Sequence, residues 1–126
     1  MCRYFVDRSK KSGKATTTLR QALTNLLDNA IRYTPAHGHI KVRVGHSNKD
    51  GRCIVEVEDD GPGIAPEEQD RIFDRFYYAK NDSDPKAQGT GLGLAIARNA
   101  VEANRGRLVL RNALEGGSVF SMSFPA

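Results

Sequence analysis

The sequence predicts an α/β (α+β) fold in which helices cover one face of a mixed β-sheet. Two observations predict it: a helical repeat of apolar residues in the first third of the chain, and several later segments in which apolar residues alternate. The chain length is a third observation, since 126 residues suffice for one compact core but not for two ordinary domains. We therefore expect one domain over residues 19–126, preceded by an N-terminal segment over residues 1–18 that is either atypical or partly disordered.

The first predicted helix begins near Leu19, where apolar residues start to recur at helical spacing through Ile31. The threonine run at 16–18 offers an N-cap, and Pro35 and Gly38 mark the end of the helix. Its apolar residues fall on one face, so we expect an amphipathic helix packed on the sheet.

Two strands and a hairpin turn are predicted next. Apolar residues at 40, 42 and 44 alternate with basic residues, which is the period of a half-buried strand. The segment Asn48–Gly51 is typical of a hairpin turn, and a second strand is expected over residues 53–58.

The second half of the chain predicts a short helix within residues 65–78, a polar loop over 79–88 and a helix over 92–103. The loop has almost nothing to bury, so we interpret it as a lid. Strands are expected over 107–111 and 119–124, joined by a turn at Glu115–Gly117.

Composition excludes several classes of function. The net charge is +4, but basic residues are scattered along the chain, and a solvated tail explains Lys10, Lys11 and Lys14 better than a nucleic-acid arm does. No segment approaches the roughly 20 apolar residues of a membrane span. Cys2 and Cys53 form no disulfide or zinc pattern, so a reduced cytosolic setting is expected.

Three polar side chains of the first predicted helix share one face. Asn25, Asn29 and Arg32 are spaced i, i+4, i+7 and lie within a stripe roughly 60° wide. The amide oxygen of Asn29 could ligate Mg²⁺, Arg32 could pair with phosphate, and the ring of Tyr33 could contact a base. Taken alone, the stripe is better explained by an ordinary polar helix face than by a binding site.

Two glycine segments follow in a fixed order. Asp59, at the end of a strand, could accept a hydrogen bond from the exocyclic amine of adenine, while Gly61 and Gly63 keep the neighbouring wall thin. The segment Gly89–Leu94 opens a helix whose N–H groups and dipole favour phosphate. A dinucleotide fold places such glycines after its first strand, whereas here a polar loop precedes them.

In this order the motifs resemble the ATP-binding catalytic domain of bacterial two-component sensor histidine kinases. Residues 25–35 resemble the family's N box, 59–64 its G1 box, 72–77 its F box and 89–96 its G2 box. The resemblance implies the Bergerat-type two-layer sandwich with a mainly antiparallel sheet. It also implies ATP and Mg²⁺ as ligands.

The resemblance further implies a role for each matching residue. Asn29 would hold magnesium, with Asn25 as a second candidate, and Arg32 and Arg75 would position the phosphates. The residues implied in nucleotide binding are Asn25, Asn29, Arg32, Tyr33, Asp59, Gly61, Gly63, Ile64, Phe76, Gly89, Thr90, Gly91, Leu92, Gly93 and Leu94.

Position 25 separates two reactions within this superfamily. Related ATPases carry a water-activating glutamate four residues before the magnesium asparagine, whereas Asn25 cannot take a proton from water. The implied reaction is instead transfer of the γ-phosphoryl group to a histidine. None of His37, His39 and His46 has the sequence context of the family's phosphoacceptor.

The missing acceptor implies partners outside this chain. We expect a histidine-bearing dimerisation domain of the same kinase, and a response regulator acting indirectly, with this domain monomeric and on the cytoplasmic side of a membrane-anchored sensor. Two departures from the family are the N-terminal segment 1–18 and Tyr78, which stands where many members have an arginine. A stand-alone ATPase and a nucleotide-free docking module are the alternatives.

Overall fold

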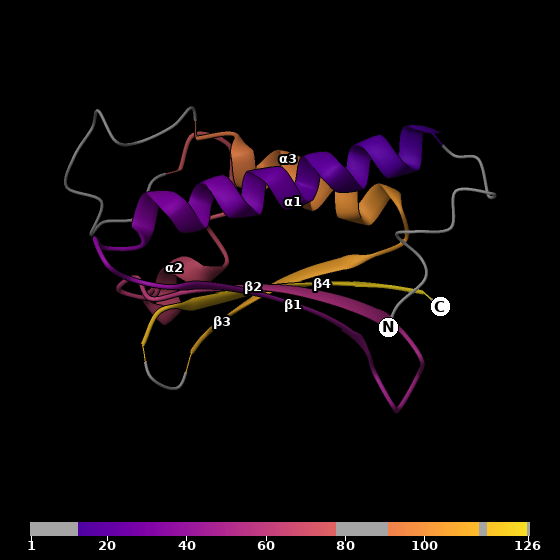
Figure 1. Cartoon of the computed structure of the whole chain (residues 1–126). Coiled ribbons are helices and arrows are strands. Elements are labelled where there is room, and N and C mark those ends of the chain that lie inside the picture. Colours follow the sequence, from indigo (N-terminus) through magenta and orange to yellow (C-terminus); the bar gives the residue numbers. More distant parts are fainter. Residues whose placement is uncertain (1–12, 78–90, 114–115, 126) are drawn as a thin grey trace.

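The computed structural model describes residues 13–77, 91–113 and 116–125, and the side chains from residue 19 onward. The elements in chain order are α1 (Gly13–Tyr33), β1 (Ile40–His46), β2 (Cys53–Asp59), α2 (Pro66–Gln69), α3 (Gly93–Ala103), β3 (Arg107–Asn112) and β4 (Ser118–Phe124). Figure 1 shows two layers, with α1 and α3 side by side on one face of the sheet.

In the described part of the chain the sheet has four strands, in the order β1-β2-β4-β3. All three pairings in the described part of the chain are antiparallel, and β4 lies between β2 and β3. The predicted two-layer α/β fold is therefore confirmed, with a sheet that is antiparallel in the described residues. The ladder aligns Asp59 at the end of β2 with Ser118 at the start of β4, which brings both residues to one end of the sheet.

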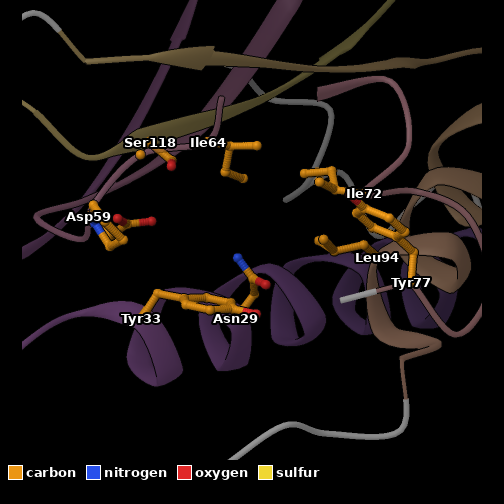
Figure 2. Close-up of a pocket in the computed structure, with 10 residues that line it drawn as sticks. Asn29, Tyr33, Asp59, Ile64, Ile72, Tyr77, Leu94 and Ser118 are labelled. Carbon is orange, nitrogen blue, oxygen red and sulfur yellow. The ribbon is translucent and has the colours of Figure 1, made fainter. Parts of the chain in front are cut away.

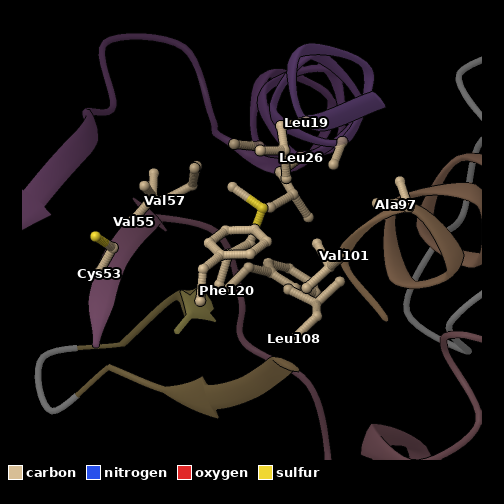
Figure 3. Packing of buried hydrophobic residues seen from close by; sticks show 14 of the residues in the cluster. Leu19, Leu26, Cys53, Val55, Val57, Ala97, Val101, Leu108 and Phe120 are labelled. Atoms are coloured by element: carbon tan, nitrogen blue, oxygen red, sulfur yellow. The ribbon is translucent and has the colours of Figure 1, made fainter. Parts of the chain in front are cut away.

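The core lies between the two helices and the inner face of the sheet (Figure 3). Leu26 from α1 and Val101 from α3 are fully buried, and Phe120 in the central strand β4 is 1% exposed. The ring of Phe73 meets that of Phe120 edge to face at 6.1 Å. This contact attaches the chain after α2 to the same core, so that the core supports both sides of the site.

Two local expectations are corrected by the structure. Helix α1 begins at Gly13, so the threonine run at 16–18 lies inside the helix and is not its N-cap. Strand β1 is not half-buried, because Val42 and Val44 are 47% and 53% exposed. They pair with Val57 and Val55, which are buried in the core, but among the described strands β1 lies at the edge of the sheet, and the described helices do not cover it.

Cys53, at the start of β2, is buried in the core. Cys2 lies outside the described residues.

Candidate functional site

A cavity opens between α1 and the start of α3 at the end of the sheet where β2 ends. It has two adjoining parts, of about 40 Å³ and about 290 Å³, and five residues line both. These shared residues are Asn29, Tyr33, Ile72, Tyr77 and Leu94. Asp59 lines the smaller part, whereas Asn25 and Arg32 line the larger one.

Helix α1 presents the predicted polar stripe to the cavity. Asn29 is 8% exposed, and Figure 2 shows its amide directed into the open space. Arg32 is exposed and lines the larger part of the cavity together with Asp28. Tyr33 lies beside Asn29, across from Asp59 (Figure 2). All three residues of the stripe thus line the larger part of the cavity.

Asn25 has a different surrounding. Its side-chain Nδ2 donates to the carbonyl oxygen of Gly93 over 3.1 Å, and its Oδ1 accepts from Nε2 of Gln21 at 3.0 Å. Gly93 is the first residue of α3, so Asn25 ties the middle of α1 to the start of the second helix. Both ends of the amide therefore make hydrogen bonds within the protein.

Asp59 is the buried acid of the site, with 2% exposure. Its Oδ1 accepts a hydrogen bond from the N–H of Gly61 over 2.8 Å. Burial raises the pKa of Asp59, while backbone hydrogen bonds from Gly61 and Ser118 partly offset that rise. A Cβ on Gly61 would lie 2.8 Å from the carbonyl oxygen of Tyr33, so glycine is needed where the turn passes the end of α1.

Two residues that lie next to Asp59 stand outside the predicted motifs. Ser118 is 5% exposed and lines the smaller part of the cavity. Gly117 precedes it with a φ of +90°, and a Cβ there would overlap the carbonyl oxygen of Asp59. The sequence signal for this part of the site is the pair of glycines directly before the last strand, which predicts a turn but not a contact with Asp59.

Asn112 at the end of β3 holds the segment after Gly63. Its Oδ1 accepts from the N–H of Ile64 and its Nδ2 donates to the carbonyl oxygen of Ile64, both over 3.0 Å. The amide of Gln69 in α2 also donates to that carbonyl oxygen, at 3.1 Å. Ile64, a predicted site residue, is thereby fixed in the cavity wall opposite Tyr33. Sequence reasoning did not find Asn112, because it lies 48 positions away.

The start of α3 forms the far side of the larger cavity. Gly91, Gly93 and Leu94 line it, and α3 is 11 residues long. The first N–H groups of a helix have no partner within the helix, and the dipole there favours negative charge. The predicted place for phosphate is thus next to Asn29 and Arg32.

Some predicted site residues are not brought into the cavity wall. Phe76 is 66% exposed and Arg75 is exposed, and neither lines the cavity. Leu92 precedes α3 without lining it. Gly89, Thr90 and the predicted lid lie outside the described residues.

The donors in the larger cavity fit magnesium. Asn29 supplies an amide oxygen and Asp28 a carboxylate on the same wall. Mg²⁺ usually takes one or two protein oxygens and completes its shell with water and substrate phosphate. Nowhere in residues 13–77, 91–113 and 116–125 do three or more His, Cys, Asp or Glu side chains gather as in a protein-only metal site. A metal shared with a ligand's phosphates suits this arrangement better.

The described helices include no membrane span, since none combines the necessary length with sufficient apolar character.

Fold and cavity together define a nucleotide-binding domain of the α/β sandwich type. A family model described as histidine kinase-, DNA gyrase B-, and HSP90-like ATPase matches residues 14–126. The chain therefore belongs to that family. Within it, the chain is similar to the ATP-binding catalytic domains of two-component sensor kinases.

Two curated relatives illustrate the similarity. The chain is 41% identical over 107 residues to the sensor histidine kinase RppB of Synechocystis, covering 85% of this chain and 23% of RppB. It is 44% identical over 137 residues to the sensor protein ChvG of Agrobacterium fabrum, covering 98% of this chain and 22% of ChvG. The chain thus spans less than a quarter of the length of these two relatives.

Solved structures of sensor histidine kinases are also similar to this chain. The mycobacterial sensor histidine kinase MprB superposes with a TM-score of 0.78 and 32% identity, over 87% of this chain and 73% of that one. Full-length ShkA in complex with AMPPNP superposes with a TM-score of 0.70 and 32% identity, over 86% of this chain and 21% of ShkA. The expected Bergerat-type architecture is confirmed by these neighbours.

Proposed function

We propose that this domain binds Mg-ATP and donates the γ-phosphoryl group to a histidine on a separate dimerisation domain of a sensor kinase. The observation that carries the proposal is one continuous wall with Asp59 at one end and Asn29, Arg32 and the start of α3 at the other. An acceptor for a base thus adjoins groups suited to phosphate and magnesium. The similarity to sensor histidine kinases supports the kinase class.

Each part of a nucleotide would have its own group in this cavity. The carboxylate of Asp59 would accept from the adenine amine, and the ring of Tyr33 would contact the base. The guanidinium of Arg32 and the N–H groups at Gly93 and Leu94 would face the phosphates. Because the helix fixes the N–H groups at the start of α3 before binding, they would neutralise charge that develops on the phosphates without further rearrangement.

Magnesium would be held by Asn29, with Asp28 on the same wall. When bound, it would supply positive charge to the phosphate oxygens. Asn25 is a weaker candidate ligand than Asn29, because both ends of its amide are already hydrogen-bonded to Gln21 and Gly93.

Phosphoryl transfer then requires a second domain. A nitrogen of the acceptor histidine would bond to the γ-phosphorus while the bond from that phosphorus to the β,γ-bridging oxygen breaks, leaving ADP. The proton of that nitrogen would pass to a base on the acceptor's own domain. We infer a response regulator as the later recipient, a monomeric state for this domain and a cytoplasmic position in a membrane-anchored sensor.

A stand-alone ATPase is the weaker reading. Such an enzyme needs a base for water near the phosphates, and position 25 holds an amide that bridges α1 and α3. This arrangement supports a structural task for Asn25 and leaves hydrolysis without a base at that position.

The test is the melting temperature with and without excess Mg-ADP. At about 100 times its dissociation constant the ligand should stabilise the fold by about 2.7 kcal/mol, or roughly 3–6 °C for this length. Asp59→Asn should abolish the rise. Asp60→Asn is the matched control, because Asp60 is exposed and bonds to His39.

The outcomes separate the candidate functions. A magnesium-dependent rise in the wild type and in Asp60→Asn, but not in Asp59→Asn, would support the proposal. No rise in a wild type that melts cooperatively would overturn it and favour the nucleotide-free docking module. Multiple turnovers of ATP by the isolated domain, lost on Asn25→Ala, would favour the ATPase.

A further inference from the structure

Tyr77 closes the end of the cavity that lies opposite Asp59. Its side chain lines both the smaller and the larger part. Figure 2 shows its ring beside Ile72 and Leu94, across the open space from Tyr33 and Asp59. The extent of the cavity at this end therefore depends on where the ring of Tyr77 stands.

The ring is held at its edge by a buried carboxylate. The hydroxyl of Tyr77 donates to Oε1 of Glu68 over 2.6 Å, and Glu68 is 6% exposed. A separation of 2.5–2.7 Å is typical of a hydroxyl that donates to an ionised carboxylate. The hydrogen bond to Glu68 is also the main cause that raises the pKa of Tyr77. The neutral phenol is thus the form that this contact favours.

The ring is held at its face by a cation. The guanidinium carbon of Arg71 lies 5.1 Å from the ring centroid of Tyr77, within the range of a cation–π interaction. Glu68 also fixes this segment through its backbone, since its carbonyl oxygen accepts from the N–H groups of Arg71 and Ile72 at 2.9 and 3.0 Å. One residue of α2 therefore anchors both the phenol and the turn that carries Arg71.

The backbone next to Tyr77 is anchored as well. The N–H of Phe76 donates to the carbonyl oxygen of Gly91 over 2.7 Å. Phe76 has a φ of +64°, a value that costs a non-glycine residue energy and persists where the surroundings enforce it. The aromatic segment is thus joined to the second glycine segment, where Gly91 lines the larger cavity.

We propose that Glu68 and Arg71 are positioning residues that hold Tyr77 as the end wall of the nucleotide cavity, an inference that rests on the proposed function. Glu68 acts on the phenol edge and Arg71 on the ring face, and neither lines the cavity. Loss of either contact frees the ring to leave the wall. The cavity would then fit its ligand less closely, although Asp59 and Asn29 remain in place.

The chain offers a matched control for this test. Glu67 is the exposed neighbour of Glu68 in α2, so Glu67→Gln makes the same chemical change without touching Tyr77. Affinity for Mg-ADP is measured by calorimetry for the wild type, Glu67→Gln, Glu68→Gln, Tyr77→Phe and the double variant Glu68→Gln/Tyr77→Phe. We expect Glu68→Gln and Tyr77→Phe each to weaken binding roughly 3–30-fold, which is the usual range for one hydrogen bond. The double variant should be no weaker than the worse single variant, because both changes act on the same hydrogen bond between Glu68 and Tyr77.

A second readout needs no ligand. In the nucleotide-free domain the tyrosines are titrated by NMR of the ring carbon that bears the hydroxyl, with Tyr77 assigned from its loss in Tyr77→Phe. We expect Glu68→Gln to lower the pKa of Tyr77 and Glu67→Gln to leave it unchanged.

The two readouts separate failure of this inference from failure of the proposed function. An unchanged Tyr77 titration in Glu68→Gln would overturn the contact itself. A shifted titration with unaltered Mg-ADP affinity would overturn the positioning role. A wild type that does not bind Mg-ADP would overturn the proposed function and the positioning role with it, whatever the titration shows.

Discussion

Alanine variants of Gly116 and Gly117, compared with each other, distinguish the cost of a left-handed backbone from the cost of a clash with the carbonyl group of Asp59. Gly116 and Gly117 have φ values of +97° and +90°. A left-handed backbone costs an alanine about 1–2 kcal/mol, so both Gly116→Ala and Gly117→Ala should lose that amount. A Cβ at Gly116 meets nothing within 4 Å, whereas one at Gly117 overlaps the carbonyl oxygen of Asp59. Relieving such an overlap typically costs a further 1–3 kcal/mol or so.

Urea denaturation measures both costs as changes in the free energy of unfolding. We expect Gly117→Ala to be less stable than Gly116→Ala by about 1–3 kcal/mol. Because the displaced atom belongs to Asp59, Gly117→Ala should also bind Mg-ADP more weakly, while Gly116→Ala should bind like the wild type. Equal stability and equal affinity in the two variants would refute the account of how the start of β4 positions Asp59.

Three other outcomes follow from burial and contacts. Val57→Ala should destabilise by about 1–3 kcal/mol and Val44→Ala by less than about 0.5 kcal/mol in the same urea assay, since Val57 is fully buried and Val44 is 53% exposed. Asp59→Asn should melt higher than the wild type at neutral pH. Since burial raises the pKa of Asp59, this carboxyl group stabilises the fold fully below the ordinary carboxyl pKa, and that stabilisation is lost as pH rises through the pKa of the folded state. The difference in melting temperature between Asp59→Asn and the wild type, measured by calorimetry, should therefore become smaller in acid. Asn25→Ala should lower stability by about 1 kcal/mol through loss of its bond to Gly93, without creating or abolishing ATP turnover in a phosphate-release assay.

Local patterns predicted most of the elements. The repeat in α1 and the alternation in β2 depend on neighbours a few residues away, so the sequence reports them directly. The exposure of Val42 could not be predicted, because it depends on β1 lying at the edge of the sheet. The start of α1 was missed because a threonine run is compatible both with an N-cap and with the first turns of a helix.

The cavity also contains both residues that local motifs predict and residues that only the fold brings in. Asn29, Arg32 and Asp59 stand in compact motifs that the sequence displays directly, and in the structure they line one cavity. The sequence does not single out Asn112 and Ser118, because each contacts the site through a segment that is distant in the chain. Asn112 hydrogen-bonds to Ile64, and Ser118 pairs with Asp59 in the sheet. Residue type alone does not distinguish such a positioning residue from any other polar residue on a surface.

Isothermal calorimetry of the domain with ADP, in the presence and absence of Mg²⁺ and with GDP as the control, tests the central claim most directly. The account predicts that ADP binds at one site, that removing Mg²⁺ weakens it, and that GDP binds much more weakly, because guanine offers a carbonyl oxygen where adenine offers the amine to Asp59. Equal affinity for ADP and GDP, or no binding by a cooperatively folded domain, would contradict it.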